Sequence, residues 1–269
     1  MYTSCADFDH GKGLHVHLRT KFVLPRKWST IEAMAVKVGE EVFEVHNNRT
    51  YFYNDEINPD LNDAELSGHK LIHKQASKPN VERHSFTVLL IGDDFDLKDS
   101  VALEITQTRR QLENNKVRES LSFQILGINQ YRRKRGKAFS DCQGLAGSWN
   151  HARNGAFLSG RSGKTYTKEE GGEFGPEWQV DSTKGDPMLF MEKVGPQLPD
   201  QKCDNSPLQA KDQRHLKALL AADGGALARQ AEEACSHVND KELFDACFFD
   251  VLVTGDVTFA QESWYTGDE

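Results

Sequence analysis

The sequence lacks the features that would place it in a membrane or on nucleic acid. Its 269 residues contain no apolar run near the roughly 18–20 residues that span a bilayer. The opening stretch MYTSCADFDHGKG has no apolar core of a leader peptide. The net charge is −8, so the chain has no electrostatic footprint for nucleic acid. The missing leader fits an intracellular protein, or a chain whose first segment has been lost.

Familiar catalytic and cofactor motifs are also absent. The sequence has no Gly-x-Ser-x-Gly elbow and no Cys-x-x-Cys pair. SGRSGKT, at 159–165, ends like a phosphate-binding loop, but Leu158 stands where that loop needs glycine. The glycine-rich segment that follows cannot continue as the required helix. We therefore predict a β-turn at Ser162–Gly163 in place of a nucleotide site.

Alternating apolar residues from about 14 to 130 predict strands. IEAMAVKVGEEVFEV has two apolar runs around Gly39-Glu40, which is typical of a hairpin. SFTVLLIG is apolar enough to be buried on both faces, whereas SVALEITQT and SLSFQILGI alternate. The polar segment 55–84 predicts a long connection with a short strand at 70–73. Many short strands separated by turns favour a sandwich or barrel.

The last quarter of the chain has a different pattern. GPQLPDQKC is typical of a linker, and helical periodicity follows it from about residue 207. ELFDACFFDVLV puts its apolar residues on one stripe, and Asn239 with Glu242 fits a capping box in front of it. The expected fold is therefore mainly β, an antiparallel β-sandwich-like domain followed by a small α-helical subdomain.

His15 and His17, in GLHVHLRT, are the candidate metal ligands. On a strand they point to the same face, and in some zinc hydrolases two such imidazoles bind the metal. Gly13 stands where those enzymes have an acidic residue, and their barrel needs eight strand-helix units that this pattern does not show. The other interpretation is the polar face of an ordinary strand whose opposite face is apolar.

Five cysteines and one sequon bear on the cellular compartment. Cys235 and Cys247 lie on successive predicted helices, and an antiparallel pair can bring their Cα atoms within the ~4.4–6.8 Å of a disulfide. Cys203 can pair with either, and the two helical cysteines can instead be small buried apolar residues. An odd count in a secreted protein leaves one thiol free or intermolecular. Asn48 begins an N-glycosylation sequon, Asn-Arg-Thr.

Several stretches together resemble a divergent von Willebrand factor type D domain, of the variety found in large secreted or surface proteins of unicellular algae. They run in the expected order from about residue 5 to 260, and the tail resembles the cysteine-bearing helical module that follows such domains. The stretches are GLHVHLRTK, WSTIEAMAVKVGEEVFEV, YFYN, FSDCQGLAGSW, GEFGPEWQV, DPMLF, GPQLPDQKC and FDACFFDVLVTGDVTFA.

The resemblance implies a β domain over residues 1–195, with its first strands missing, and a helical module over 203–262. It makes GLHVHLRT a core strand and not a metal centre. It also implies that Cys142 can pair with Cys5 and close the sheet domain.

Relatives carry a calcium loop after Gly-Leu-Cys-Gly, but here Ala146 replaces that cysteine and only Asn150 and Asn154 resemble oxygen ligands. Calcium prefers six to eight oxygens. No cofactor is therefore expected, and calcium at these two residues is the alternative.

The leading functional hypothesis is a non-catalytic module at the cell surface or outside the cell. Its partner would be a protein or a glycan of the surface or matrix, and the odd cysteine would allow a disulfide-linked oligomer. The alternative is an intracellular metal-dependent hydrolase that uses His15 and His17. A third hypothesis is a degenerate module without independent activity, which a cooperative thermal melt would contradict.

Overall fold

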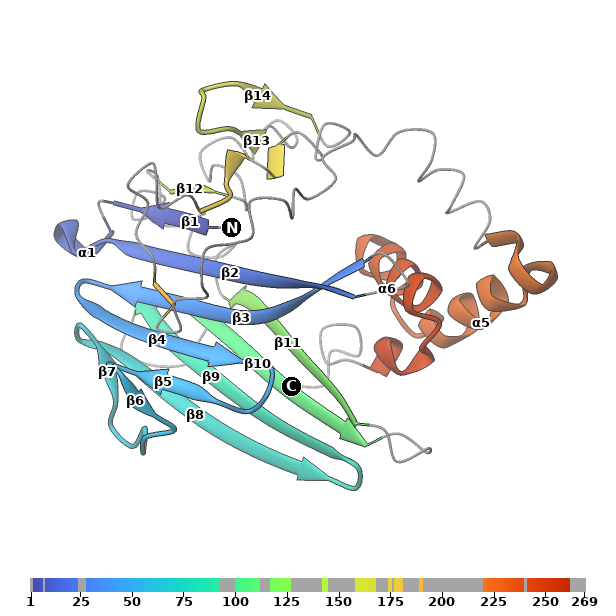
Figure 1. Cartoon of the computed structure of the whole chain (residues 1–269), viewed down its shortest axis with the longest axis horizontal. Helices are drawn as coiled ribbons and strands as arrows, with labels where there is room; N and C mark the ends of the chain where they lie inside the picture. The colour runs from blue at the N-terminus through green and yellow to red at the C-terminus, as the bar shows by residue number, and fades with distance from the viewer. Residues whose placement is uncertain are drawn as a thin grey trace. The chain divides into compact units, whose positions relative to one another are not determined.

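The computed structural model of the chain describes the greater part of the strands and the C-terminal helices. The described residues are 2–6, 8–23, 28–91, 100–111, 117–126, 142–144, 158–167, 174–175, 177–180, 189–190, 220–239 and 241–261. The chain divides into two compact units (Figure 1): residues 1–21 with 29–205, and residues 22–28 with 206–269.

The first unit contains two large antiparallel sheets and one small hairpin. The seven-stranded sheet has the order β12 (Gln143–Gly144), β1 (Tyr2–Cys5), β2 (Leu14–Val23), β3 (Trp28–Val38), β4 (Glu41–His46), β5 (Tyr51–Tyr53), β6 (Glu56–Ile57). The five-stranded sheet has the order β11 (Val117–Leu126), β10 (Val101–Gln111), β9 (Val81–Ile91), β8 (His69–Lys78), β7 (Glu65–Leu66). Strands β13 (Leu158–Ser159) and β14 (Thr165–Tyr166) form the small hairpin.

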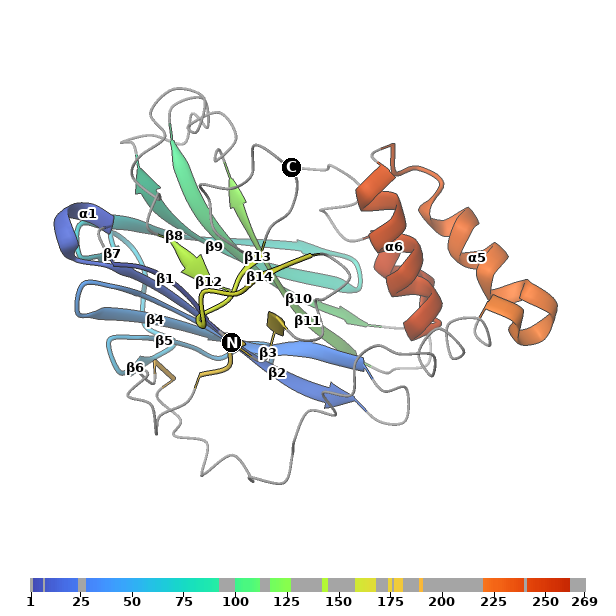
Figure 2. The ribbon, with the colours of Figure 1, turned by 90° about the horizontal axis from the view of Figure 1, so that it is seen from above.

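The two large sheets pack face to face around one core, so the unit is a β-sandwich, as predicted. Figure 2 shows them as two layers, with β1 to β6 on one side and β8 to β11 on the other. The rings of Phe43 on β4 and Phe86 on β9 meet with their centroids 5.2 Å apart, and both side chains are fully buried. Burial of aliphatic and aromatic side chains of this size stabilises a core by ~1.5–3 kcal/mol each.

Turn chemistry explains where the hairpins lie. Gly39 connects β3 to β4 with a φ of 58°, a left-handed conformation that glycine adopts without strain. β8 ends at Lys78, directly before Pro79, and β9 begins after Asn80, which has a φ of 65°. Proline cannot donate to a strand ladder and asparagine tolerates the left-handed region, so this pair ends one strand and starts the next.

Strand β8 differs from its prediction. We expected a short strand at 70–73 within a polar connection, but β8 covers His69–Lys78. Its polar half pairs with β9 through Lys78, residue by residue. The pattern missed this strand because most of its residues after Ile72 are polar and exposed, so the hydrogen bonds to β9 decide its length. Phe86 to Leu90 are buried on both faces, as predicted. In β10 and β11 the alternating apolar residues face the core, but the expected wet face of β10 is wrong, because Ala102, Thr106 and Thr108 on its other face are also buried.

Apart from the adjoining ends of β2 and β3, the described part of the second unit is helical, as predicted. It contains η3 (Ala222–Gly225), α5 (Ala226–Cys235), α6 (Lys241–Thr254) and η4 (Val257–Gln261). Its small core consists of buried residues from α5, α6 and η4, with Phe244 and Phe248 packed against it. Leu243 was expected on the buried stripe but is 41% exposed, since it lies in the first turn of α6 at the end of that stripe.

Candidate functional site

His15 and His17, the predicted metal candidates, lie on β2 with their side chains on the face opposite the core. Leu14 and Val16 alternate with them and belong to the core. His15 is half-buried, and burial followed by the charge of Lys37 lowers the pKa of its imidazole. His17 is 1% exposed and lies beside the Phe190 ring, with centroids 6.3 Å apart. In the part of the chain that the structure describes, no three His, Cys, Asp or Glu side chains form a group that could hold a metal.

A line of charged and polar groups continues along this face. Arg19 Nη2 lies 3.3 Å from Nδ1 of His46, and Nε of Arg19 lies 3.3 Å from a Glu32 carboxylate oxygen. Since the guanidinium only donates, Nδ1 of His46 accepts, and its Nε2 donates to the fully buried carboxylate of Glu44. One ring nitrogen of His46 thus binds the buried carboxylate of Glu44 and the other accepts from Arg19, so both contacts fix the orientation of the ring.

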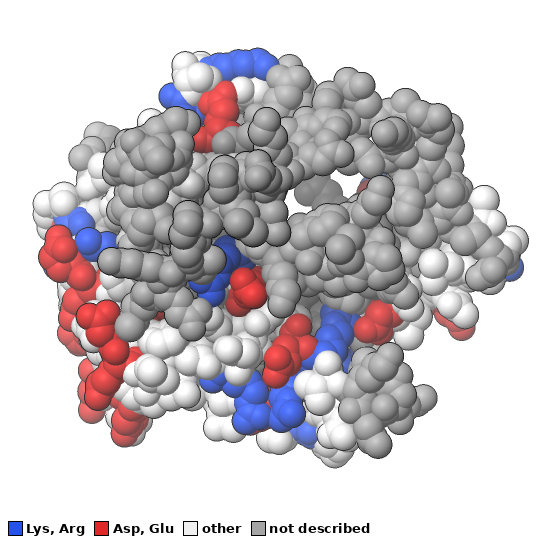
Figure 3. All heavy atoms as spheres, viewed as in Figure 1, with Lys and Arg blue, Asp and Glu red and all other residues white. Residues whose placement is uncertain are grey.

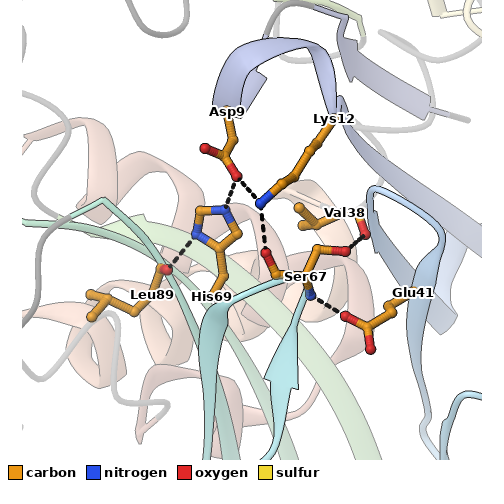
Figure 4. A network of polar contacts seen from close by, with 7 residues as sticks. All are labelled: Asp9, Lys12, Val38, Glu41, Ser67, His69 and Leu89. Carbon is orange, nitrogen blue, oxygen red and sulfur yellow. Dashed lines mark hydrogen bonds and ion pairs between the residues drawn. The ribbon is translucent and has the colours of Figure 1, made fainter.

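Figure 4 shows a second polar network, which connects four separate segments of the first unit. The Asp9 carboxylate, in the turn labelled α1 (Phe8–Gly11), accepts from Lys12 Nζ at 2.7 Å and from His69 Nε2 at 3.1 Å. Lys12 Nζ also donates to the Ser67 carbonyl at 2.9 Å. His69 Nδ1 lies 3.2 Å from the Leu89 carbonyl. The hydrogen bond from Lys12, with that from His69, lowers the pKa of Asp9 against the opposing effect of burial.

The contacts of this network hold separate segments of the first unit together. Both ring nitrogens of His69 face acceptors, the Asp9 carboxylate and the Leu89 carbonyl. The Ser67 hydroxyl donates to the Val38 carbonyl at 2.7 Å, and the Ser67 amide donates to the Glu41 carboxylate. Ser67 and His69 are thus hydrogen-bonded to different groups, and not to each other, in these contacts. The contacts join α1, the β3–β4 turn, the β7–β8 turn and β9.

A third cluster, which the sequence analysis missed, contains two imidazoles bonded to each other. Nε2 of His73 on β8 lies 2.9 Å from Nδ1 of His84 on β9. Nε2 of His84 lies 3.4 Å from a carboxylate oxygen of Glu82, so Nε2 of His84 carries the hydrogen and its Nδ1 accepts from His73. The ring of His73 stacks on Phe86, with centroids 4.6 Å apart and planes at 10°. Burial, and then the charge of His84, lower the pKa of His73.

Glu82 is itself held in place in this cluster. Its carboxylate lies 3.4 Å from Nη1 of Arg49, which comes from the β4–β5 turn of the other sheet, and accepts from Gln75 Nε2 at 3.2 Å. Strand register explains the meeting of the two histidines: His73 pairs with Phe86 and Gln75 pairs with His84, so the imidazoles are diagonal neighbours. Diagonal pairs of long side chains are within reach of each other on a sheet.

The cysteines form a disulfide in each unit. Cys5 of β1 is bonded to Cys142, which directly precedes β12, and both side chains are buried. Cys235 of α5 is bonded to Cys247 of α6. Cys203, Asn150 and Asn154 lie outside the described residues. Asn48 is exposed in the β4–β5 turn, where its Oδ1 accepts from the Thr50 amide at 3.2 Å and leaves Nδ2 as the atom that a glycan would join.

The SGRSGKT stretch forms a β-turn between β13 and β14, but Arg161 and Ser162 are at its centre, one position before the predicted Ser162–Gly163. The Gly163 amide donates to the Gly160 carbonyl at 3.0 Å between β13 and β14. The Glu177 carboxylate accepts from the Ser162 amide at 2.9 Å and from the Tyr166 hydroxyl. The Ser162 amide and the Tyr166 hydroxyl therefore donate to the Glu177 carboxylate, in the place where a phosphate-binding loop would donate to a phosphate.

Acidic side chains gather on one part of the surface. Figure 3 shows them over β5 to β7 at the left of the view. The exposed acidic residues of this segment are Asp55, Glu56, Asp60, Asp63 and Glu65. Because these carboxylates are exposed, water hydrates them. Their negative charges contribute to the net charge of −8.

Comparison with known proteins does not assign this architecture to a family. No protein-family model matches the chain, and no curated protein is similar to it. None of the helices in the described residues is long and apolar enough to cross a membrane. The fold and the sites define the chain as an antiparallel β-sandwich closed by a disulfide, joined to a small helical unit that has its own disulfide.

Proposed function

We propose that the chain is a non-catalytic interaction module of the von Willebrand factor type D kind that works outside the cell or at its surface. The observation that carries the proposal is the presence of a disulfide in each of the two units. Disulfides persist in oxidising compartments and are rare in the cytosol. The Cys5–Cys142 bond fastens β1 to the short strand β12 at the sheet edge, which suits a rigid platform for a partner.

The exposed sequon supports the same location. Asn48 lies in a turn and is exposed, as a glycosylated asparagine must be. The expected partner is a protein or a glycan of the surface or matrix. The two disulfides use four of the five cysteines, so Cys203 is the residue through which chains would be linked covalently.

The decisive experiment is the intact mass of protein from its native host, with thiols alkylated before and after reduction. We expect one alkylated cysteine before reduction, or none if Cys203 links two chains, and five after reduction. A hexose-bearing increment should be present in the wild type and absent from Asn48→Gln. Cys203→Ser should abolish any reducible dimer. Five alkylated cysteines before reduction, with no glycan, would place the protein in a reducing compartment and contradict the proposal.

A further inference from the structure

We propose that His73 and His84 form an open binding site for a divalent d-block cation, such as Ni²⁺, Cu²⁺ or Zn²⁺, with Glu82 as the carboxylate that orients His84. This inference is independent of the proposed function. It rests on two ring nitrogens from neighbouring strands that face each other at 2.9 Å. Imidazole is a preferred ligand of these metals, and the affinity of such a site generally rises from Ni²⁺ to Cu²⁺.

The spacing of the nitrogens favours one coordination geometry. With metal–nitrogen bonds of about 2.05 Å, two ligands at 90° lie about 2.9 Å apart, whereas two tetrahedral ligands lie about 3.3 Å apart. The observed 2.9 Å corresponds to neighbouring positions of a square-planar or octahedral ion. That geometry is typical of Cu²⁺ and Ni²⁺. The rings would have to rotate so that both lone pairs point at the ion, and the terminal torsion of histidine is broad enough for this.

The hydrogen positions already suit His84 as a ligand. Its Nδ1 is the unprotonated nitrogen, and its Nε2 hydrogen points at Glu82, 3.4 Å away. A carboxylate on the far nitrogen is the usual partner of a metal-bound histidine and raises its basicity. His73 would bind through Nε2, and its hydrogen would move to Nδ1, so no net proton is released.

The backbone and the neighbouring rings hold the pair in place. β9 lies in the middle of its sheet, β8 is paired with it from Leu71 to Lys78, and the His73 ring stacks on Phe86. The side chain of His84 is 16% exposed, so an ion can reach it from solvent. Because no described group offers three protein ligands, water or a partner's side chain would fill the remaining positions. This makes the site weaker than a closed structural zinc site.

The test uses the full chain after alkylation of any free thiol. Ni²⁺ is titrated calorimetrically into the wild type, His73→Phe, His84→Phe and Glu82→Gln. Phenylalanine at 73 keeps a ring against Phe86 while removing the nitrogens. His237→Ala, at an exposed position in the second unit, is the matched control that also removes one histidine.

We expect saturable binding with one ion per chain, and at least tenfold weaker binding in either histidine variant. Glu82→Gln should weaken binding by ~10-fold or more, as expected for loss of an outer carboxylate. The control should bind like the wild type. Unchanged binding in both histidine variants, or equal loss in the control, would overturn the proposal.

A spectroscopic measurement on the wild type keeps the proposal testable if a variant fails to fold. Electron paramagnetic resonance of the Cu²⁺ complex should show coupling to two imidazole nitrogens at one equivalent of metal. A spectrum with no coordinated imidazole, or with Cu²⁺ spread over several sites, would overturn the two-histidine site. Signal that persists in His84→Phe but disappears in a His15→Phe, His17→Phe variant would move the site to β2.

Discussion

Removing the Cys5–Cys142 disulfide should cost the first unit more stability than removing Cys235–Cys247 costs the second. The reason is the length of chain that each bond closes in the unfolded state. The cysteines of the first pair are 137 residues apart and those of the second 12. The chain-entropy relation gives about 5 kcal/mol at 25 °C for the long loop and about 2.8 kcal/mol for the short one. The expected difference is therefore about 2 kcal/mol.

The assay is hydrogen exchange followed by mass spectrometry over a urea series, because it reads the two units separately. Cys5→Ala with Cys142→Ala is compared with the wild type on peptides of β2 to β4, and Cys235→Ala with Cys247→Ala on peptides of α5 and α6. A loss below about 1 kcal/mol in the first comparison would refute the reasoning, and so would a larger loss in the second. A small loss in the first comparison would mean that the unfolded chain already holds the ends of the long loop together.

Three further outcomes are expected. Phe43→Ala, at a position with 0% exposure, should lower the free energy of unfolding by about 3–5 kcal/mol in urea melts, and a loss under 1 kcal/mol would mean that Phe43 is not at the core. Gly144→Ala should release β12 from β1, since its Cβ would lie 2.4 Å from the Thr3 Cα, and amide exchange at Thr3 should then quicken. Asp9→Asn should destabilise the protein more at pH 7 than at pH 3. The hydrogen bond from Lys12 depresses the pKa of this carboxyl, so its contribution is present above the unfolded value of about 3.9 and is lost as the pH falls through the folded one. An equal effect of Asp9→Asn at both pH values would count against that ion pair.

Local sequence signals predicted the strands that have a clear apolar period and the turns that glycine defines. The hairpin at Gly39 and the double-sided burial of β9 were both visible in this way. The same method missed the second half of β8, where the sequence KQASK has no apolar residue but alanine. Pairing with β9 supplies the hydrogen bonds there, and no single segment shows its partner's sequence.

The two disulfides show the same limit. Cys235 and Cys247 are 12 residues apart on adjacent helices, so a local argument brings them close, although it left Cys203 as a competing partner. Cys5 and Cys142 are 137 residues apart, and no periodicity connects them. Their pairing came only from the resemblance to a type D domain, because contacts at that separation depend on the whole sheet order.

The histidine motif that stands out in the sequence, His15 and His17, is not the pair whose ring nitrogens are in contact, which is His73 and His84. His15 and His17 are two residues apart on β2, so their backbones are about 6.6 Å apart along the strand. The ring beside His17 is that of Phe190, over which the Arg19 guanidinium also lies, 5.0 Å from the centroid. His15 and His17 alternate with the core residues Leu14 and Val16, as polar residues do on any strand that has one face on the core. His73 and His84 are 11 residues apart in sequence, yet the register of the Pro79–Asn80 hairpin brings their nitrogens to 2.9 Å. In an antiparallel sheet, side chains on opposite sides of a hairpin can therefore come closer than side chains two residues apart on one strand, and this pair could have been found by extending the predicted strand at 70–73 to Lys78.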